Sequence, residues 1–178
     1  MYIWVGINVE DQLREVRRAV DGVFEKIEIS NVTCQLPLHI SLKISFEIEN
    51  SLFDSVLADI TRVYEDCEPF EIKVKGIEKH ENIEWIRMYS NEKVEALATE
   101  LNMMLRERYG VPLHEYDLDF IFHTTLFMDD DMEKINEAHK LLGNVYLPER
   151  LVADAFVIGN SETGKNGTYR IYKTIKKK

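Results

Sequence analysis

The stretch LHISLKISF, residues 38–46, alternates apolar with polar side chains, a pattern typical of a β-strand that buries one face. In a strand, residues i and i+2 project to the same side. We therefore expect His39 and Ser41 to share one face, with Lys43 next in line. The isoleucines and leucine between them are expected to pack on the opposite face, against helices.

A second stretch, FHTTLFM at residues 122–128, carries the same combination of side chains. His123 and Thr125 are expected to share a strand face, as the first pair does. Of the five histidines in the chain, only His39 and His123 are followed by x-Ser/Thr-Leu. A lone strand histidine is more often a packing residue than a catalyst, but the recurrence of the motif favours a functional pair.

Hydrophobic periodicity around these stretches predicts alternating strands and helices. Strands are expected at 2–8, 38–46, 69–78, 83–89, 119–128, 151–159 and 168–174, and helices at 10–27, 51–66, 91–109 and 131–143. The order strand, helix, histidine strand, helix, strand thus occurs twice, with Trp4 and Trp85 opening the two copies.

The repeated order predicts one domain, 1–178, made of two pseudo-symmetric lobes. The repeat units are about 1–80 and 81–160, and a C-terminal strand at 168–174 closes a hairpin around the turn at 164–167. Two such units side by side would relate the histidine strands by a pseudo-twofold axis. The two pairs of imidazole and hydroxyl would then converge on one cleft.

Two imidazoles over one cleft suit the cleavage of a phosphodiester. One would take a proton from the attacking water or hydroxyl, and the other, protonated, would deliver one to the leaving ribose oxygen. The unperturbed histidine pKa of about 6.5 permits both protonation states near neutral pH. The hydroxyls of Ser41 and Thr125 would donate hydrogen bonds to the non-bridging phosphate oxygens. The sequence leaves open whether His39 or His123 is the base.

Three further residues are candidate substrate contacts. Lys43, if it turns inward, would stabilise charge that develops on the phosphate. Tyr169 and Arg170 would contact a base or a phosphate if their hairpin abuts the cleft, although a role on the strand surface is an equal alternative.

The remaining histidines, His80, His114 and His139, show no partner spacing typical of a metal site, so no metal ligands are expected. The acidic run 129–131 stands at a predicted helix start, where N-capping explains it better than a divalent ion does.

The net charge of the chain limits which kinds of ligand it is expected to bind. The formal net charge of −10 argues against tight binding of long RNA or DNA, which needs a basic face, but is compatible with a small anion in a locally positive pocket. Two cysteines are too few for a disulfide framework. With no signal peptide and no membrane-spanning stretch evident, we expect a cytoplasmic protein without membrane contact, and a monomer.

The motifs His39-Ile40-Ser41-Leu42 and His123-Thr124-Thr125-Leu126 resemble those of the two-histidine (2H) phosphoesterase superfamily, which includes bacterial 2′-5′ RNA ligase (LigT-like) and cyclic-nucleotide phosphodiesterase enzymes. The resemblance covers essentially the whole element order. It implies a bilobal, duplicated α+β fold with two antiparallel sheets flanked by helices around a central cleft. It also implies cleavage or joining of a 2′,3′-cyclic or 2′-5′ phosphodiester without a metal or other cofactor, with the motif histidines as acid and base and the motif hydroxyls binding phosphate.

The chain departs from that pattern in places. Ser41 replaces a common Thr, residues 44–46 replace Phe-Leu-Gly, and Met128 stands where an Arg is common. These departures favour a divergent branch that hydrolyses a small nucleotide or short RNA end over an RNA ligase. The alternatives are a non-catalytic module that binds nucleotide or phosphate, and an interaction protein in which both motifs only pack.

Overall fold

The computed structural model describes residues 1–30, 32–118 and 120–177. Four antiparallel strands form the first sheet in the order β2-β1-β7-β8. They span His39–Glu47 (β2), Tyr2–Asn8 (β1), Ala155–Ser161 (β7) and Arg170–Lys176 (β8). The histidine strand β2 is therefore an edge strand of its sheet.

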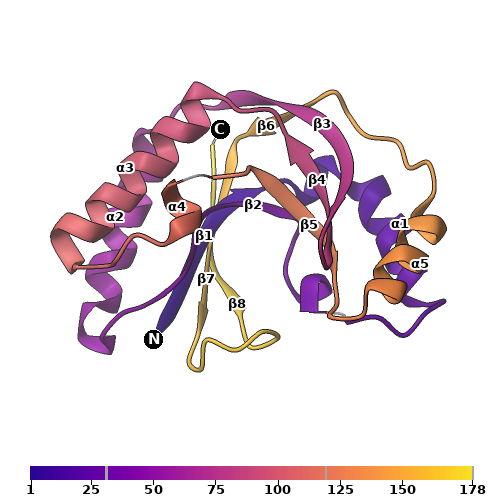
Figure 1. Cartoon of the computed structure of the whole chain (residues 1–178). Helices are drawn as coiled ribbons and strands as arrows, with labels where there is room; N and C mark the ends of the chain where they lie inside the picture. The colour runs from indigo at the N-terminus through magenta and orange to yellow at the C-terminus, as the bar shows by residue number, and fades with distance from the viewer. Residues whose placement is uncertain (31, 119, 178) are drawn as a thin grey trace.

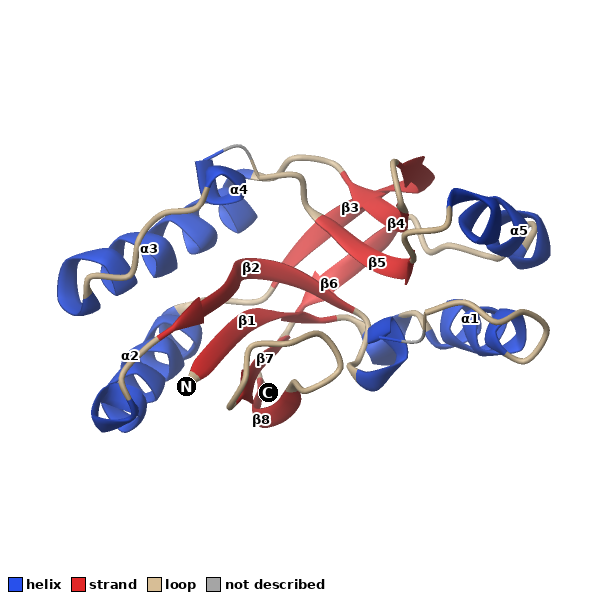
Figure 2. Ribbon diagram, turned by 60° about the horizontal axis from the view of Figure 1, so that its bottom comes forward, coloured by secondary structure: helices blue, strands red, loops and turns tan. Residues whose placement is uncertain are grey.

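Four further antiparallel strands form the second sheet in the order β5-β4-β3-β6. They span His123–Met128 (β5), Ile83–Met88 (β4), Phe70–His80 (β3) and Arg150–Ala153 (β6). The second histidine strand, β5, is again an edge strand, and it lies beside β2 (Figure 2). The expected α+β class with two antiparallel sheets is confirmed.

The third strand of each predicted repeat unit lies in the sheet of the other unit. β3 pairs with β4, with Ile77 opposite Ile86, and β7 pairs with β1, with Val5 opposite Ile158. The strand expected at 151–159 is in fact two strands, β6 and β7, because the chain passes from the second sheet to the first between them. The first sheet thus combines the two ends of the chain, and the second is built from its middle.

The helices gather in two pairs, one at each end of the sheets (Figures 1 and 2). At one end α2 packs on α3, and at the other α1 packs on α5. They span Arg14–Phe24 (α1), Phe53–Asp66 (α2), Glu92–Tyr109 (α3) and Met132–Leu142 (α5). Each pair joins one helix from each half of the chain, as the strand exchange requires. None of the described helices combines the length and apolar character needed to cross a bilayer.

Local sequence signals set the helix ends. The Asn91 side chain accepts hydrogen bonds from the backbone N–H groups of Lys93 and Val94 and caps the start of α3. Gly110, with φ of 69°, ends the same helix in the left-handed conformation that glycine adopts without strain. Asp131 accepts from the N–H of Glu133 at the start of α5, which confirms the expected N-cap in the acidic run.

Two further expected elements differ from the structure. The first helix, expected over 10–27, is a short 3₁₀ turn at Glu10–Gln12 followed by α1. The strand expected from 119 begins only at His123, after a short helix α4 (Glu115–Leu118), and residue 119 lies outside the described residues. Phe122, just before His123, already lies at the second sheet, because its carbonyl oxygen accepts from the N–H of Met88 on β4 at 2.9 Å.

The core lies between the sheets and the helices. On each long helix, fully buried apolar residues recur every three or four positions, as in Val94, Leu97, Leu101 and Leu105 of α3. The strands contribute alternate residues, such as Ile40 and Leu42 of β2, which have no exposed surface. His39 and Ser41 lie on the other face and are only partly buried. The apolar alternation of the strand thus leaves the two polar residues facing away from the helices.

Gly6 lies where the backbones of β1 and β2 approach each other closely. A Cβ added there would lie 2.7 Å from the carbonyl oxygen of Ile40 and 3.3 Å from Cδ2 of His39. We expect Gly6→Ala to lower the free energy of unfolding by about 1–3 kcal/mol, because backbone atoms must shift to admit the methyl group. The measurement is chemical denaturation.

Gly22→Ala is the matched control. Gly22 lies inside α1 with no atom within 4 Å of an added Cβ, so alanine should stabilise the protein by about 0.5–1 kcal/mol. Equal stabilities of the Gly6→Ala variant and the unchanged protein would contradict the close approach.

Candidate active site

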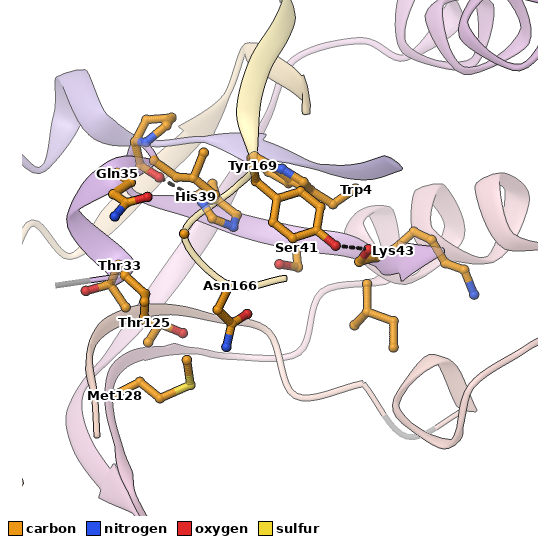
Figure 3. A pocket seen from close by; sticks show the side chains of 16 residues that line it. Trp4, Thr33, Gln35, His39, Ser41, Lys43, Thr125, Met128, Asn166 and Tyr169 are labelled. Atoms are coloured by element: carbon orange, nitrogen blue, oxygen red, sulfur yellow. Dashed lines mark hydrogen bonds between the residues drawn. The ribbon is translucent and has the colours of Figure 1, made fainter. Parts of the chain in front are cut away.

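A pocket of about 380 Å³ opens between the two histidine strands and the β7–β8 hairpin loop (Figure 3). Its lining includes His39 and Ser41 from β2, Thr125 from β5, and Asn166 and Tyr169 from the hairpin. The volume falls in the range of about 300–1,000 Å³ usual for small-ligand sites. His39, Ser41 and Thr125, which come from distant parts of the sequence, thus share one cavity, whereas His123 is not among the residues that line it.

The two motif histidines have the same local geometry. Nδ1 of His39 lies 2.7 Å from the carbonyl oxygen of Pro37, and Nδ1 of His123 lies 2.6 Å from that of Ile121. A carbonyl oxygen only accepts hydrogen bonds, so each Nδ1 carries the proton. In the neutral ring Nε2 then holds the lone pair, and it is the nitrogen available for proton transfer.

A tryptophan supports each of these imidazoles. The ring centroids of Trp4 and His39, and those of Trp85 and His123, are both 4.3 Å apart. The sequence signal for this role is the placement of one tryptophan at the start of each predicted copy. Each indole fixes its neighbouring imidazole from one side, which limits the ring to a narrow range of orientations.

The surroundings of the two tryptophans differ. Trp4 lies over Gly159, where an added Cβ would be 2.1 Å from the indole nitrogen, so only glycine leaves room for the ring. Trp85 instead stacks on His80, with centroids 5.0 Å apart and the planes tilted by 9°. The two imidazoles therefore have similar immediate surroundings, but the residues that pack behind their tryptophans differ: the backbone at Gly159 behind Trp4 and the His80 ring behind Trp85.

Burial makes both histidines weak bases. It lowers the pKa of His39 from 6.5 to about 4, against the effect of the Pro37 hydrogen bond, and the nearby charge of His123 lowers it further. Burial also lowers the pKa of His123, opposed by the bond to Ile121, and His80 adds to the decrease. The electrostatic effect of His123 on His39 indicates that the two rings lie near enough to interact.

Lys43 does not continue the row of His39 and Ser41. The register of β1 and β2 shifts between the pairs Gly6–Ser41 and Val5–Lys43, so the strict alternation assumed from the sequence fails at this point. The Lys43 side chain is 2% exposed and pairs with Asp117, and its Nζ donates to the carbonyl oxygen of Pro112 at 3.1 Å. Figure 3 shows the lysine side chain extending away from His39 and Ser41.

The structure places the two candidate residues of the hairpin, Tyr169 and Arg170, in different surroundings. Tyr169 lines the pocket, and its hydroxyl bonds to the Ser45 hydroxyl of β2 and to the carbonyl oxygen of Gly164, the latter at 3.2 Å. Arg170 is exposed on β8 opposite Asn160 and does not line the pocket. The hairpin therefore brings the tyrosine, and not the arginine, to the candidate site.

Arg87 is a cation that sequence reasoning missed. It stands directly opposite His123 in the pairing of β4 with β5, and residues paired in this way project to the same face of a sheet. Its side chain is 37% exposed, and its Nη1 lies 3.3 Å from a carboxylate oxygen of Glu78. No motif marks this residue, because only the strand pairing places it beside His123.

The other histidines have structural partners. His139 bonds through Nδ1 to the fully buried Glu84 at 2.7 Å, and burial raises the pKa of that carboxyl group. His114 is exposed and packs on Tyr116. Within the described ranges, no group of three or more histidine, cysteine, aspartate or glutamate side chains is arranged to hold a metal ion.

Comparison with known protein families gives one match over most of the chain. The sequence profile of the 2′-5′ RNA ligase superfamily matches residues 32–165. This segment contains both histidine motifs. No curated protein sequence matches the chain significantly.

Solved structures agree on the fold. TT0787 of Thermus thermophilus is 17% identical with a TM-score of 0.63, and the match covers 99% of this chain and 97% of that protein. Apo LigT of E. coli is 15% identical with a TM-score of 0.61, covering 98% and 96%. Usb1 of Kluyveromyces marxianus is 11% identical with a TM-score of 0.51, covering 98% and 97%. Other LigT crystal structures hold phosphate, 3′-AMP, NADP⁺ or ATP. At these identities the likeness concerns the fold alone.

The lowered pKa values predict the titration of the free protein. NMR of the imidazole signals should show both motif histidines titrating below 6.5, with His39 at about 4. Because the unfolded chain binds these protons near pH 6.5, the free energy of unfolding should fall as the pH drops from 6.5 towards 4. Inorganic phosphate in the pocket should raise both pKa values, since an anion stabilises the imidazolium.

His39→Gln and His123→Gln variants assign the two signals. Inflections at or above 6.5 in the absence of phosphate would contradict the burial of the two rings.

Proposed function

The chain belongs to the 2′-5′ RNA ligase superfamily of two-histidine phosphoesterases, and from this premise we propose that it hydrolyses a 2′,3′-cyclic or 2′-5′-linked phosphodiester on a nucleotide or short RNA end. The observation that carries the proposal is the matched pair of imidazoles, each with Nδ1 bound to a backbone carbonyl and Nε2 available. Two such nitrogens near one pocket can move protons on both sides of a phosphorus atom.

In the proposed mechanism His39 is the base and His123 the acid. Burial holds His39 strongly in the neutral form, which is the form that accepts a proton through Nε2. His39 takes a proton from water, whose oxygen attacks phosphorus, and the bond to the leaving ribose oxygen breaks. Protonated His123 gives its Nε2 proton to that oxygen. The product is a phosphomonoester with a free hydroxyl, and one proton has passed from one imidazole to the other.

The hydroxyls of Ser41 and Thr125 are the proposed phosphate ligands. Each stands two residues after its histidine on the same strand face, and both line the pocket. A hydroxyl without a base beside it is a poor nucleophile but a good donor to a non-bridging oxygen. In this position it stabilises the charge that develops as the phosphodiester is cleaved.

Four observations support a small substrate. The pocket volume suits a nucleotide, and the net charge of −10 disfavours a long polyanion. The tyrosine of the hairpin, Tyr169, lies at the pocket with an aromatic face that suits a base. The relative LigT has been crystallised with phosphate and with 3′-AMP. We propose that this chain accepts ligands of the same chemical class.

His39→Ala and His123→Ala test the proposal. Each should lower kcat for hydrolysis of a 2′,3′-cyclic nucleotide by about 10²- to 10⁴-fold, the usual contribution of a general acid or base. The control is His114→Ala, because His114 is exposed and lies outside the pocket, and its kcat should be unchanged. Since the mechanism uses only imidazoles and hydroxyls, a chelator should leave activity unchanged.

Undiminished turnover in either motif variant would overturn the mechanism. Tight nucleotide binding without turnover across a broad panel of phosphodiesters would instead support a binding module with the same pocket.

Arg87 is proposed to contact the substrate phosphate beside His123. Arg87→Gln should raise KM about tenfold, the effect of losing a charged hydrogen bond of roughly 1.5 kcal/mol. Glu78→Gln frees the guanidinium from its carboxylate and should lower KM or leave it unchanged. Arg150→Gln on the same sheet is the control, because Arg150 forms an exposed pair with Glu71 away from the pocket. An unchanged KM in Arg87→Gln would exclude the contact.

A further inference from the structure

A buried ion pair joins the first histidine strand to the connection that leads into the second. The side chains of Lys43 and Asp117 are 2% and 0% exposed. Lys43 also donates to the carbonyl oxygen of Pro112, and Asp117 also accepts from the backbone N–H of His114 at 2.7 Å. Each charged group thus has two partners. Lys43 itself lines the candidate pocket, but Asp117, Pro112 and His114 do not.

The pair lies where the two sheets meet. Lys43 follows Ser41 on β2, and Asp117 belongs to α4, which precedes His123 in the chain. Figure 2 shows α4 on the same side of β2 as the second sheet. The pair therefore joins β2, which carries His39, to α4, the short helix that precedes β5 in the chain.

Two hydrogen bonds brace the histidine strands in a corresponding way. The carbonyl oxygen of Leu42, at the end of the first motif, accepts from the Asn102 amide of α3 at 3.3 Å. The carbonyl oxygen of Leu126, at the end of the second motif, accepts from the Thr33 hydroxyl at 2.9 Å. Each edge strand is held by a side chain from the other half of the chain, and Lys43–Asp117 adds a charged contact on the first.

Stability alone is a weak reason for such a pair. Taking two charges out of water costs several kcal/mol, so a buried ion pair often adds little net stability over apolar residues of the same size. Its directional contacts, in contrast, permit only one arrangement of the two segments. We therefore expect the main effect of this pair to be a fixed arrangement of β2 and α4, and not added stability.

We propose that Lys43 and Asp117 are positioning residues that fix the separation of the two histidine strands, and with it the distance between the His39 and His123 imidazoles across the substrate. This inference rests on the proposed function. It also gives Lys43 a role other than the direct phosphate contact expected from the sequence. The two roles predict opposite effects of neutralising Asp117.

A double-mutant cycle with Lys43→Met and Asp117→Asn separates the roles. If the pair positions the histidines, each single variant should lower kcat for a 2′,3′-cyclic nucleotide by about tenfold or more, because small misplacements of catalytic groups are costly. KM should change by less than about threefold, a small effect in free energy. The double variant should lose no more than the worse single variant, because both changes remove the same interaction.

The phosphate-contact role predicts a different pattern. Lys43→Met would then raise KM and weaken binding of inorganic phosphate, whereas Asp117→Asn would free the ammonium and leave KM unchanged or lower. That pattern would overturn the proposal. A double variant with kcat restored to that of the unchanged protein would also overturn it, since the pair would then matter only for folding.

If a single variant folds poorly, the thermal midpoint and kcat of the double variant still test the proposal. The double variant contains no unpaired buried charge, so its thermal midpoint should lie near that of the unchanged protein while its kcat stays reduced. The control cycle uses Arg150→Met and Glu71→Gln, an exposed pair between β6 and β3, and should leave kcat unchanged.

A separate measurement distinguishes failure of this inference from failure of the proposed function. If the unchanged protein hydrolyses no phosphodiester, the function is wrong, but NMR can still follow how His123→Gln shifts the titration of His39. That shift should be smaller in the Asp117→Asn background, because the two rings are no longer held together. An equal shift in both backgrounds would overturn the positioning role independently of turnover.

Discussion

The exchange of third strands is the constraint on which the rest of the structure depends. β7 reaches β1 from the far end of the chain, and β3 crosses to β4, so each sheet needs strands from both predicted units. This pairing leaves the two histidine strands, β2 and β5, as edge strands that lie side by side. An unpaired edge is normally a liability, and here a side chain from the opposite half of the chain bonds to one carbonyl oxygen on each edge strand, that of Leu42 and that of Leu126.

Much of this arrangement follows from short-range patterns in the sequence. Periodicity located the long helices and most strands to within a few residues, and the two x-Ser/Thr-Leu motifs identified the strands that meet at the pocket. The strand exchange was not predicted, because which strands pair depends on contacts between distant residues. The turn of the Lys43 side chain away from His39 and Ser41 was missed for a related reason. The register shift between β1 and β2 is a property of the pairing and leaves no mark on the sequence of β2 alone.

Two cationic side chains around the candidate site, Lys43 and Arg87, are each paired with a carboxylate. Lys43 is neutralised by Asp117 and Arg87 is held by Glu78, so both of these cations are already paired before a substrate arrives. The neutral imidazoles add little positive charge of their own. A phosphate entering such a site meets mainly hydroxyl donors, and its own charge would raise the pKa of the histidines around it. Binding and protonation are therefore coupled, which suits a reaction that needs one imidazole in each state.

The two imidazoles have the same tautomer, but the residues that pack behind their tryptophans differ. Trp4 packs against the backbone at Gly159, whereas Trp85 packs against the polar ring of His80. Burial lowers the pKa of His39 to about 4, and it also lowers the pKa of His123, which the nearby ring of His80 lowers further. A symmetric pair would compete for one proton without preference. In the proposed reaction His39 gains one proton and His123 loses one, so the strongly lowered pKa of His39 favours the starting state in which His39 is neutral.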